Sequence, residues 1–134
     1  MNSENILSVQ NLSFSYDKET SILNNVSFKL KKGDIAVFLG ESGVGKTTFI
    51  RLLAGLEHPK TGKILKYNET LNSSKDFVPA NKRNFAVVFQ EDSLFPHLNV
   101  LNNIKIAQKN KNLKEIDELL DFFGILPHKN KYPH

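Results

Sequence analysis

The sequence predicts an α/β fold in which a buried strand, a glycine-rich loop and a helix follow an antiparallel pair of strands. Three observations support this prediction. The run IAVFLG at residues 35–40 is apolar on both faces, as in a strand buried within a parallel sheet. The stretch GESGVGKTT at residues 40–48 follows it directly, and apolar side chains at helical spacing come next. Two segments of alternating polarity precede the whole unit.

The antiparallel pair is predicted from those two alternating segments. In LSVQNLSFSY, residues 7–16, apolar and polar side chains alternate with one slip near Asn11, which indicates a half-buried strand with a bulge. Residues 17–21 are polar and turn-like, and VSFKL at residues 26–30 alternates again. We therefore expect two antiparallel strands joined by a loop.

A helix is expected to begin within the glycine-rich loop and to run to about Glu57. Gly55 near its end and Pro59 beyond it are suitable stop signals. TGKILKY at residues 61–67 predicts a short strand, and the polar residues 68–84 predict an irregular excursion. The apolar positions at helical spacing are Phe49, Leu52, Leu53 and Leu56.

The remaining third of the chain predicts one more strand and two helices. NFAVVFQ at residues 84–90 reads as a second buried strand, followed by a loop broken by Pro96. Residues 98–108 form a roughly periodic helix, and residues 113–126 form a clearer one that stops at Gly124. The predicted apolar side of the second helix consists of Leu113, Ile116, Leu119, Leu120 and Phe123.

Length and composition limit the classes of protein. A chain of 134 residues with 40% hydrophobic content forms one compact domain with a real core. It contains no cysteine, so there is no disulfide partner and no thiolate metal site, which fits the cytosol. The net charge of +4 is scattered, so no nucleic-acid partner is predicted. No stretch approaches the roughly 20 apolar residues that span a bilayer, so any membrane association is peripheral.

The glycine-rich loop satisfies the phosphate-binding pattern G-x-x-x-x-G-K-[ST] from Gly40 to Thr47, between a predicted strand and a predicted helix. Its glycines allow backbone angles that other residues avoid, so that successive N–H groups converge on phosphate oxygens. The free N–H groups and the positive dipole end of the first helical turn add to the same site. The predicted nucleotide-binding residues of the loop are Gly40, Glu41, Ser42, Gly43, Val44, Gly45, Lys46, Thr47 and Thr48.

The loop pattern also predicts individual roles. Lys46 would place its ammonium group on the β- and γ-phosphates of ATP, and Thr47 would offer its hydroxyl group to Mg²⁺. Thr48 and the backbone amides from Ser42 onward would reach the remaining phosphate oxygens. Charge-assisted hydrogen bonds of this type contribute about 1.5–3 kcal/mol each, so several of them support nucleotide binding without a catalytic group. Binding and hydrolysis are therefore separate questions.

Together these features resemble the nucleotide-binding subunit of an ATP-binding-cassette (ABC) transporter, over essentially the whole chain. The resemblance implies that Tyr16 stacks on adenine; an ordinary cross-strand aromatic residue is the alternative. It also implies that Gln90 belongs to the glutamine loop of the family, where the amide coordinates Mg²⁺ or orients the attacking water. A polar residue that simply ends a strand is the alternative for Gln90.

A further alternative concerns the acids after Gln90. An apolar strand followed by Glu91 and Asp92 could instead be a Walker B strand, whose carboxylates hold Mg²⁺ and position water. Gln90 stands at the immediate end of the strand, and the two acids lead into an apolar loop. This position favours the glutamine loop, because a carboxylate directed at the metal must sit at the strand end.

The most specific part of the resemblance is LFPHLNV, residues 94–100. It resembles import-type ATPases for ferric iron, polyamines, sulfate, molybdate and maltose-like sugars, in the surface that receives the coupling helix of the membrane-spanning permease subunit. The resemblance thus implies a permease partner at Leu94 to Val100 and a location at the inner face of the cell membrane. The four histidines, at positions 58, 97, 128 and 134, share no ligand spacing, so no histidine metal site is predicted.

The resemblance implies a partial nucleotide-binding domain over residues 1–134, incomplete at its C-terminal end. Residues 1–90 would form the β part and the P-loop core, and residues 91–134 the start of the helical subdomain. The sequence contains no L-S-G-G-Q signature and no later strand ending in Asp-Glu. In the family, two such ATPase subunits sandwich ATP, so a truncated chain is expected to bind ATP and Mg²⁺ without hydrolysing ATP alone.

Three functional hypotheses follow from these observations. The first is a truncated ATP-binding subunit of an import system, for ferric iron first and for polyamine, sulfate or another solute next. The second is a regulatory or interaction module that binds a nucleotide without turnover. The third is a different P-loop enzyme such as a small kinase, for which the sequence shows neither an acceptor site nor catalytic acids.

Overall fold

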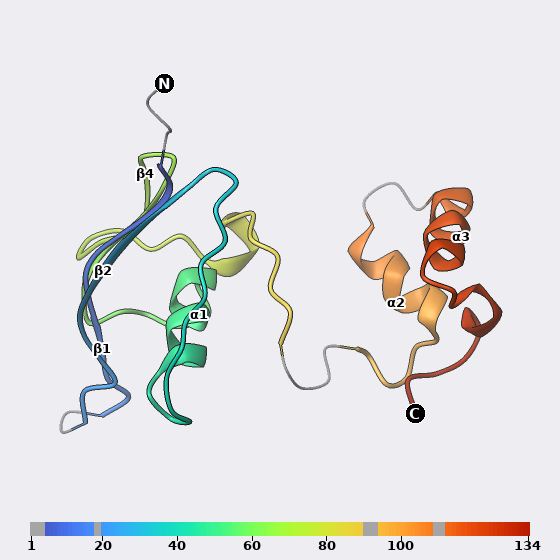
Figure 1. Cartoon of the computed structure of the whole chain (residues 1–134), viewed down its shortest axis with the longest axis horizontal. Coiled ribbons are helices and arrows are strands. Elements are labelled where there is room, and N and C mark those ends of the chain that lie inside the picture. Colours follow the sequence, from blue (N-terminus) through green and yellow to red (C-terminus); the bar gives the residue numbers. More distant parts are fainter. Residues whose placement is uncertain (1–4, 18–19, 90–93, 109–111) are drawn as a thin grey trace. The chain divides into compact units, whose positions relative to one another are not determined.

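The computed structural model describes residues 5–17, 20–89, 94–108 and 112–134. The chain divides into two compact units, Met1–Val87 and Val88–His134 (Figure 1). The first unit contains a β-sheet and helix α1, and the second contains helices α2 and α3. The phosphate-binding pattern therefore lies in the first unit, and the stretch 94–100 lies in the second.

The sheet of the first unit has four antiparallel strands in the order β2-β1-β3-β4. Their bounds are Asn5–Phe14 for β1, Leu23–Lys31 for β2, Thr61–Lys66 for β3 and Glu69–Asn72 for β4. Val9 in β1 lies opposite Phe28 in β2 and Ile64 in β3. The predicted antiparallel pair and the predicted short strand at residues 61–67 are confirmed.

The bulge predicted near Asn11 is also confirmed. The pairing of β1 with β2 shifts register between Val9 and Leu12, and Asn11 has a φ of 49°. Asparagine adopts this left-handed conformation more readily than most residues do. The Asn11 N–H donates to the Ser27 hydroxyl oxygen at 2.8 Å, and that hydroxyl donates to Asn11 Oδ1 at 3.1 Å. These two hydrogen bonds, which involve side chains, take the place of backbone hydrogen bonds that the bulge interrupts.

Strand β4 lies within residues 68–84, which were predicted to be irregular. It pairs with β3 through a two-residue turn, Tyr67 and Asn68, whose φ values are 46° and 68°. Positive φ at both central residues matches the type I′ turn that suits the twist of a hairpin. The prediction missed β4 because the strand has only four residues and Leu71 is its one apolar side chain.

Helix α1 (Lys46–Ala54) covers one face of the sheet (Figure 1). It ends three residues before the predicted end, because Gly55 has a φ of 78° and leaves the helical conformation. The N–H groups of Gly55 and Leu56 donate back to the carbonyls of Leu52 and Arg51, which closes the last turn. The core between helix and sheet contains Leu7, Val9, Leu12, Phe14, Leu23, Phe49, Leu52, Ile64 and Leu71.

Two segments predicted to be buried strands form no strand in the described part of the chain. Residues 35–40 are extended but outside the sheet, and Ile35 is 91% exposed. Residues 84–89 behave in the same way, and Val88 is 92% exposed. Both predictions of buried strands are wrong here, because a strand needs hydrogen bonds from a neighbouring strand and none of the described strands lies beside these segments. Phe38 is held through edge contacts with Phe28 and Phe49, and Phe85 packs against the core.

A buried arginine fixes the end of α1. The guanidinium group of Arg83 donates to the carbonyls of Leu52 and Leu53 at 2.8 and 2.9 Å, and to that of Val78 at 2.6 Å. Burial lowers the pKa of Arg83 below its ordinary value. The acceptors from α1 are carbonyls of its last turn, where the helix dipole is negative and favours a cation. The hydrogen bonds of Arg83 therefore hold the last turn of α1 against residues 78–83.

The second unit consists of α2 (Val100–Ala107) and α3 (Leu113–Phe122), two helices that the sequence predicted. Asparagine side chains cap both N-termini: Asn99 accepts from the Asn102 N–H at 2.9 Å, and Asn112 accepts from the Lys114 N–H at 3.1 Å. The 3₁₀ turn η2 (Leu126–His128) also belongs to this unit, whereas the 3₁₀ turn η1 (Ala80–Lys82) belongs to the first. Ile116 and Leu120 are buried as predicted.

The other predicted apolar positions of α3 are exposed, namely Leu113, Leu119 and Phe123. Of the five apolar residues predicted to share one side of this helix, Ile116 and Leu120 are therefore the buried ones. The stop at Gly124 is confirmed: the Gly124 N–H donates to the Asp121 carbonyl, and the next N–H donates to Leu120. These two bonds form a Schellman motif around the φ of 68° at Gly124.

Candidate functional site: the phosphate-binding loop

The glycine-rich loop leads directly into α1, with Gly45 as the N-cap of the helix. The three loop glycines at 40, 43 and 45 all have positive φ, as the pattern predicted. At Gly45 a side chain is also excluded by contact, because a Cβ atom would lie 2.9 Å from the Ile22 side chain and 3.3 Å from its carbonyl oxygen. The sequence folds this way locally because only glycine fits both the conformation and the space.

Lys46 reaches back across the loop that precedes it. Its ammonium group donates to the carbonyl of Gly40 at 2.8 Å and to that of Glu41 at 2.6 Å. Both acceptors are uncharged, so the positive charge of Lys46 is not neutralised by these contacts. The loop thus holds a cation against its own backbone, where an anionic ligand could take the place of the carbonyls.

The first turn of α1 is open to a ligand. None of the described side chains caps the helix N-terminus, and the first turn carries no acidic residue. The N–H groups of that turn therefore point outward without a helical partner, at the positive end of the helix dipole. Thr47 is exposed and Thr48 is half-buried, so neither threonine is locked in the core.

Tyr16 follows the end of β1 and is 61% exposed. Its ring meets the Phe14 ring edge-on, with 4.8 Å between centroids, which leaves most of the tyrosine surface uncovered. The Phe14 carbonyl accepts from the Ile22 N–H at 2.9 Å, and Ile22 in turn lies against Gly45. These contacts bring the end of β1 to the same side of the unit as the start of α1.

These features form an anion site made of loop glycines, an uncapped helix N-terminus and a lysine. Phosphate groups suit such a site, because backbone N–H groups and the helix dipole both favour negative charge. The fold and the site thus define a P-loop protein.

The chain matches the ABC transporter family over residues 23–133, and it belongs to that family. Among curated relatives, it is 38% identical over 135 residues to "Fe(3+) ions import ATP-binding protein FbpC" of Haemophilus influenzae (strain 86-028NP). It is 36% identical to "Fe(3+) ions import ATP-binding protein FbpC 2" of Haemophilus influenzae strain Rd. Each alignment covers 96% of this chain, whereas the chain spans only 38% of the length of each relative.

Solved structures support the fold. The chain is similar to cbiO1 from Clostridium perfringens, part of the ABC transporter complex cbiONQ, with a TM-score of 0.74 and 27% identity. That alignment covers 96% of this chain and 54% of the other. A bacterial Atm1-family ABC exporter with ATP bound gives a TM-score of 0.79 at 24% identity, over 98% of this chain and 24% of that one. The predicted fold class, an α/β ABC-type P-loop protein, is confirmed.

The predicted permease-docking stretch, residues 94–100, lies in the second unit. Its side chains Leu94, Phe95 and His97 are exposed, and the Phe95 and His97 rings meet with centroids 5.9 Å apart. The Asn103 amide nitrogen donates to the carbonyls of Phe95, Leu98 and Asn99, and Asn103 Oδ1 accepts from the Phe95 N–H at 2.8 Å. One side chain of α2 therefore holds the shape of this loop.

Some predicted site residues lie outside the described chain. Gln90, Glu91 and Asp92 fall within residues 90–93, so the structure does not compare the glutamine loop with the Walker B alternative. Among the described residues, no cluster of three or more His, Cys, Asp or Glu side chains could hold a metal ion. None of the described helices combines the length and apolar character needed to cross a bilayer.

Two supporting residues were not predicted. Arg83 and Asn103 each use one side chain to tie several backbone carbonyls together. A lone arginine or asparagine in a polar stretch has no sequence signature, because its partners are main-chain groups that any residue supplies. Only the tertiary contacts reveal them.

Proposed function

We propose that this chain binds ATP with Mg²⁺ and forms the nucleotide-binding part of an ABC import ATPase subunit. The observation that carries the proposal is the uncapped N-terminus of α1 beside Lys46, whose ammonium group is held only by two carbonyls of its own loop. A polyphosphate would replace those carbonyls and accept the outward N–H groups. We propose this function for the 134-residue chain and not for its longer relatives.

The roles follow the loop pattern. Lys46 would bind the β- and γ-phosphates, and the backbone from Gly40 to Thr48 would surround the phosphate chain. Thr47 and Gln90 would hold Mg²⁺, which neutralises phosphate charge when bound. The exposed hydroxyl of Thr47 fits a hard cation that prefers oxygen ligands. The uncovered ring of Tyr16 would stack on adenine.

We further propose binding without turnover for the chain alone. The 134 residues contain no L-S-G-G-Q signature and no strand ending in Asp-Glu, the parts that complete the site and position water in the family. Gln90 would then act as the glutamine-loop residue and not as a sufficient catalytic group. Hydrolysis would require both parts: the signature of a second ATPase subunit and a strand ending in Asp-Glu.

The proposed partners and solute come from the relatives. Residues 94–100 would receive a permease subunit, because exposed apolar side chains in a loop fixed by Asn103 form a preshaped contact surface. The transported solute would be ferric iron, as the names of the two Haemophilus relatives state for those proteins. Polyamine and sulfate are the alternatives. The chain would act at the cytoplasmic face of the membrane, bound through the permease.

Calorimetric titration of the purified chain with Mg-ATP tests the first proposal. We expect saturable binding that Lys46→Ala weakens by about tenfold or more, since one charge-assisted contact contributes about 1.5–3 kcal/mol. Lys29→Ala is the matched control, because Lys29 is an exposed lysine on β2 outside the loop, and it should leave the affinity unchanged. Equal affinities for wild type and Lys46→Ala would contradict the assignment of the loop.

A phosphate-release assay separates the transporter subunit from a nucleotide-binding module without turnover. The assay compares the chain alone with the chain plus a permease and an intact ATPase subunit of the same system. Stimulated hydrolysis that Lys46→Ala abolishes would exclude the module. No stimulation, together with tight ATP binding, would exclude the transport role.

A further inference from the structure

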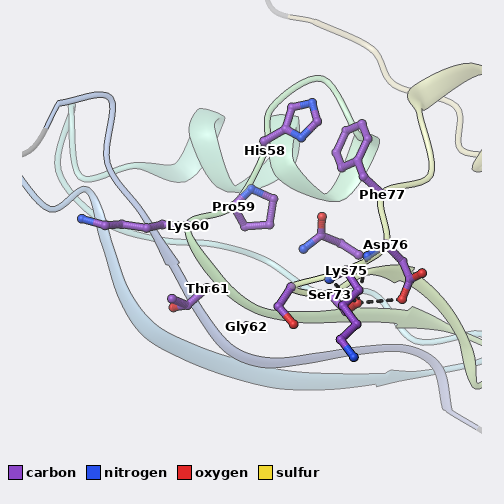
Figure 2. Close-up of a pocket in the computed structure, with 11 residues that line it drawn as sticks. His58, Pro59, Lys60, Thr61, Gly62, Ser73, Lys75, Asp76 and Phe77 are labelled. Atoms are coloured by element: carbon purple, nitrogen blue, oxygen red, sulfur yellow. Dashed lines mark hydrogen bonds between the residues drawn. The ribbon is translucent and has the colours of Figure 1, made fainter.

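We propose that a polar cavity on the first unit binds a small oxyanion, either a carboxylate or a phosphate group, at a site that shares no residue with the phosphate-binding loop. The cavity has a volume of about 260 Å³. It lies between residues 58–62 and the turn that follows β4 (Figure 2). The phosphate-binding pattern does not account for its polar lining, because none of the lining residues belongs to residues 40–48.

Asn72, the last residue of β4, lines the cavity. The residue is only 4% exposed, and its side-chain amide has no hydrogen-bond partner within the described chain. Its backbone is fixed by pairing with Ile64 and by a bridge to Phe77. The amide atoms are accessible from the cavity, since they are not among the buried side-chain atoms without a partner in the described chain. A ligand oxygen could therefore accept from this amide inside the cavity.

The charge of the lining selects an anion. Lys60 and Lys75 are exposed beside the cavity, and neither forms an ion pair with a described residue. Figure 2 shows them extending from different sides of it, each on a flexible stem that can turn toward a ligand. Asp76 is the single carboxylate of the lining, and it already accepts from the Ser73 hydroxyl at 2.8 Å. The uncommitted charges are therefore positive.

One wall of the cavity is preorganised. The rings of His58 and Phe77 stack with 3.6 Å between centroids and 18° between planes. The guanidinium carbon of Arg83 lies 5.0 Å from the Phe77 centroid, so the phenyl ring is held by a second group. The turn is also fixed, because the Ser73 hydroxyl oxygen accepts from the N–H groups of Lys75 and Asp76. A ligand would therefore bind against a wall that is already ordered, so binding would not bear the free-energy cost of ordering it.

The cavity has room for more than a single water molecule on Asn72. One water takes up roughly 30 Å³, far less than the cavity volume. Phosphate or a short dicarboxylate fits the space, offers acceptors to the Asn72 amide and carries the charge that Lys60 and Lys75 complement. A cation or an apolar ligand would leave these groups unpaired.

NMR titration of the 134-residue chain with succinate, and separately with inorganic phosphate, tests the proposal. We expect saturable shifts of the backbone amides at residues 58–62 and 72–77 with at least one probe. The double variant Lys60→Ala/Lys75→Ala should weaken that binding by about tenfold or more. Lys29→Ala, which removes an exposed charge outside the cavity, should not change it. A response to succinate alone assigns a carboxylate ligand, and a response to phosphate alone assigns a phosphate ligand.

Phosphate can also bind at the loop around Lys46, so its titration is repeated in a Lys46→Ala background. Shifts at residues 58–62 and 72–77 that persist in this background support a separate site, whatever the outcome at the loop. Asn72→Asp, which is nearly isosteric, adds a negative charge and should abolish binding. Should that buried variant unfold, the exposed double lysine variant still decides. No saturable shift with either probe, or equal weakening by Lys29→Ala, would overturn the proposal.

Discussion

The antiparallel sheet and the two segments at residues 35–40 and 84–89 are all rich in apolar side chains but differ in burial. In the sheet, Leu12 and Ile64 are fully buried against α1. Residues 35–40 and 84–89 are as apolar, yet Leu39 is 88% exposed. Residues 37–39 line an apolar cavity of about 390 Å³ beside the start of α1, where the Phe38 ring meets the Phe49 ring edge-on. Side chains of residues 85–87 line a second apolar cavity, of about 200 Å³.

The difference shows that a hydrophobic run is not sufficient for a strand. Strands β1 and β3 are held by hydrogen bonds on both sides, whereas neither apolar segment has a ladder partner within the described chain. Exposed apolar side chains beside unpaired backbone groups favour association with another strand. Substitutions in the buried core should therefore change stability, and substitutions in the exposed apolar segments should change association.

The largest effect is expected for Leu12→Ala in the core. Removal of this buried side chain should lower the free energy of unfolding by about 2–5 kcal/mol, as typical for leucine in a packed core. Leu39→Ala is the matched control and should change it by less than about 0.5 kcal/mol, because its side chain is already in solvent. Urea unfolding followed by circular dichroism measures both. Equal losses would show that residues 35–40 are buried in solution.

Arg83→Met should have the next largest effect. The variant removes the donor to the carbonyls of Leu52, Leu53 and Val78, so we expect a loss of about 2–3 kcal/mol in the free energy of unfolding. Arg51→Met is the control, since Arg51 is exposed and its ion pair with Glu57 at 3.1 Å contributes less than about 1 kcal/mol. A loss no greater than that of the control would rule out the anchoring role of Arg83.

Val88→Asn should have the smallest effect on stability, within about 0.5 kcal/mol, because the side chain is exposed. It should nevertheless reduce self-association, since it removes apolar surface from an unpaired segment. Sedimentation velocity over a range of concentrations measures this change. Lys29→Asn, an exposed substitution within β2, serves as the control and should leave association unaltered. Reduced association in both variants would contradict the role of the exposed apolar surface at Val88 in self-association.

Local signals predicted most elements correctly. Alternation identified β1 and β2, and Gly124 identified the end of α3, whereas α1 ends at Ala54, three residues before the predicted Glu57. The phosphate-binding loop was predictable because its glycines and Lys46 act within nine consecutive residues. Arg83 and Asn72 were not predictable, since the partners of Arg83 lie up to 31 residues away and the exposure of the Asn72 amide to a cavity depends on chain folding.

The sequence by itself determined the strand-forming alternation, the helix ends and the phosphate-binding loop, because each depends on residues that are neighbours in the chain. Tertiary structure alone decided which apolar runs are buried, since burial requires a surface contributed by distant residues. Tertiary structure also decided that Arg83 donates hydrogen bonds to the last turn of α1 and that Asn72 lines a cavity. Local conformation is encoded residue by residue, whereas hydrogen-bond partners and burial belong to the assembled fold.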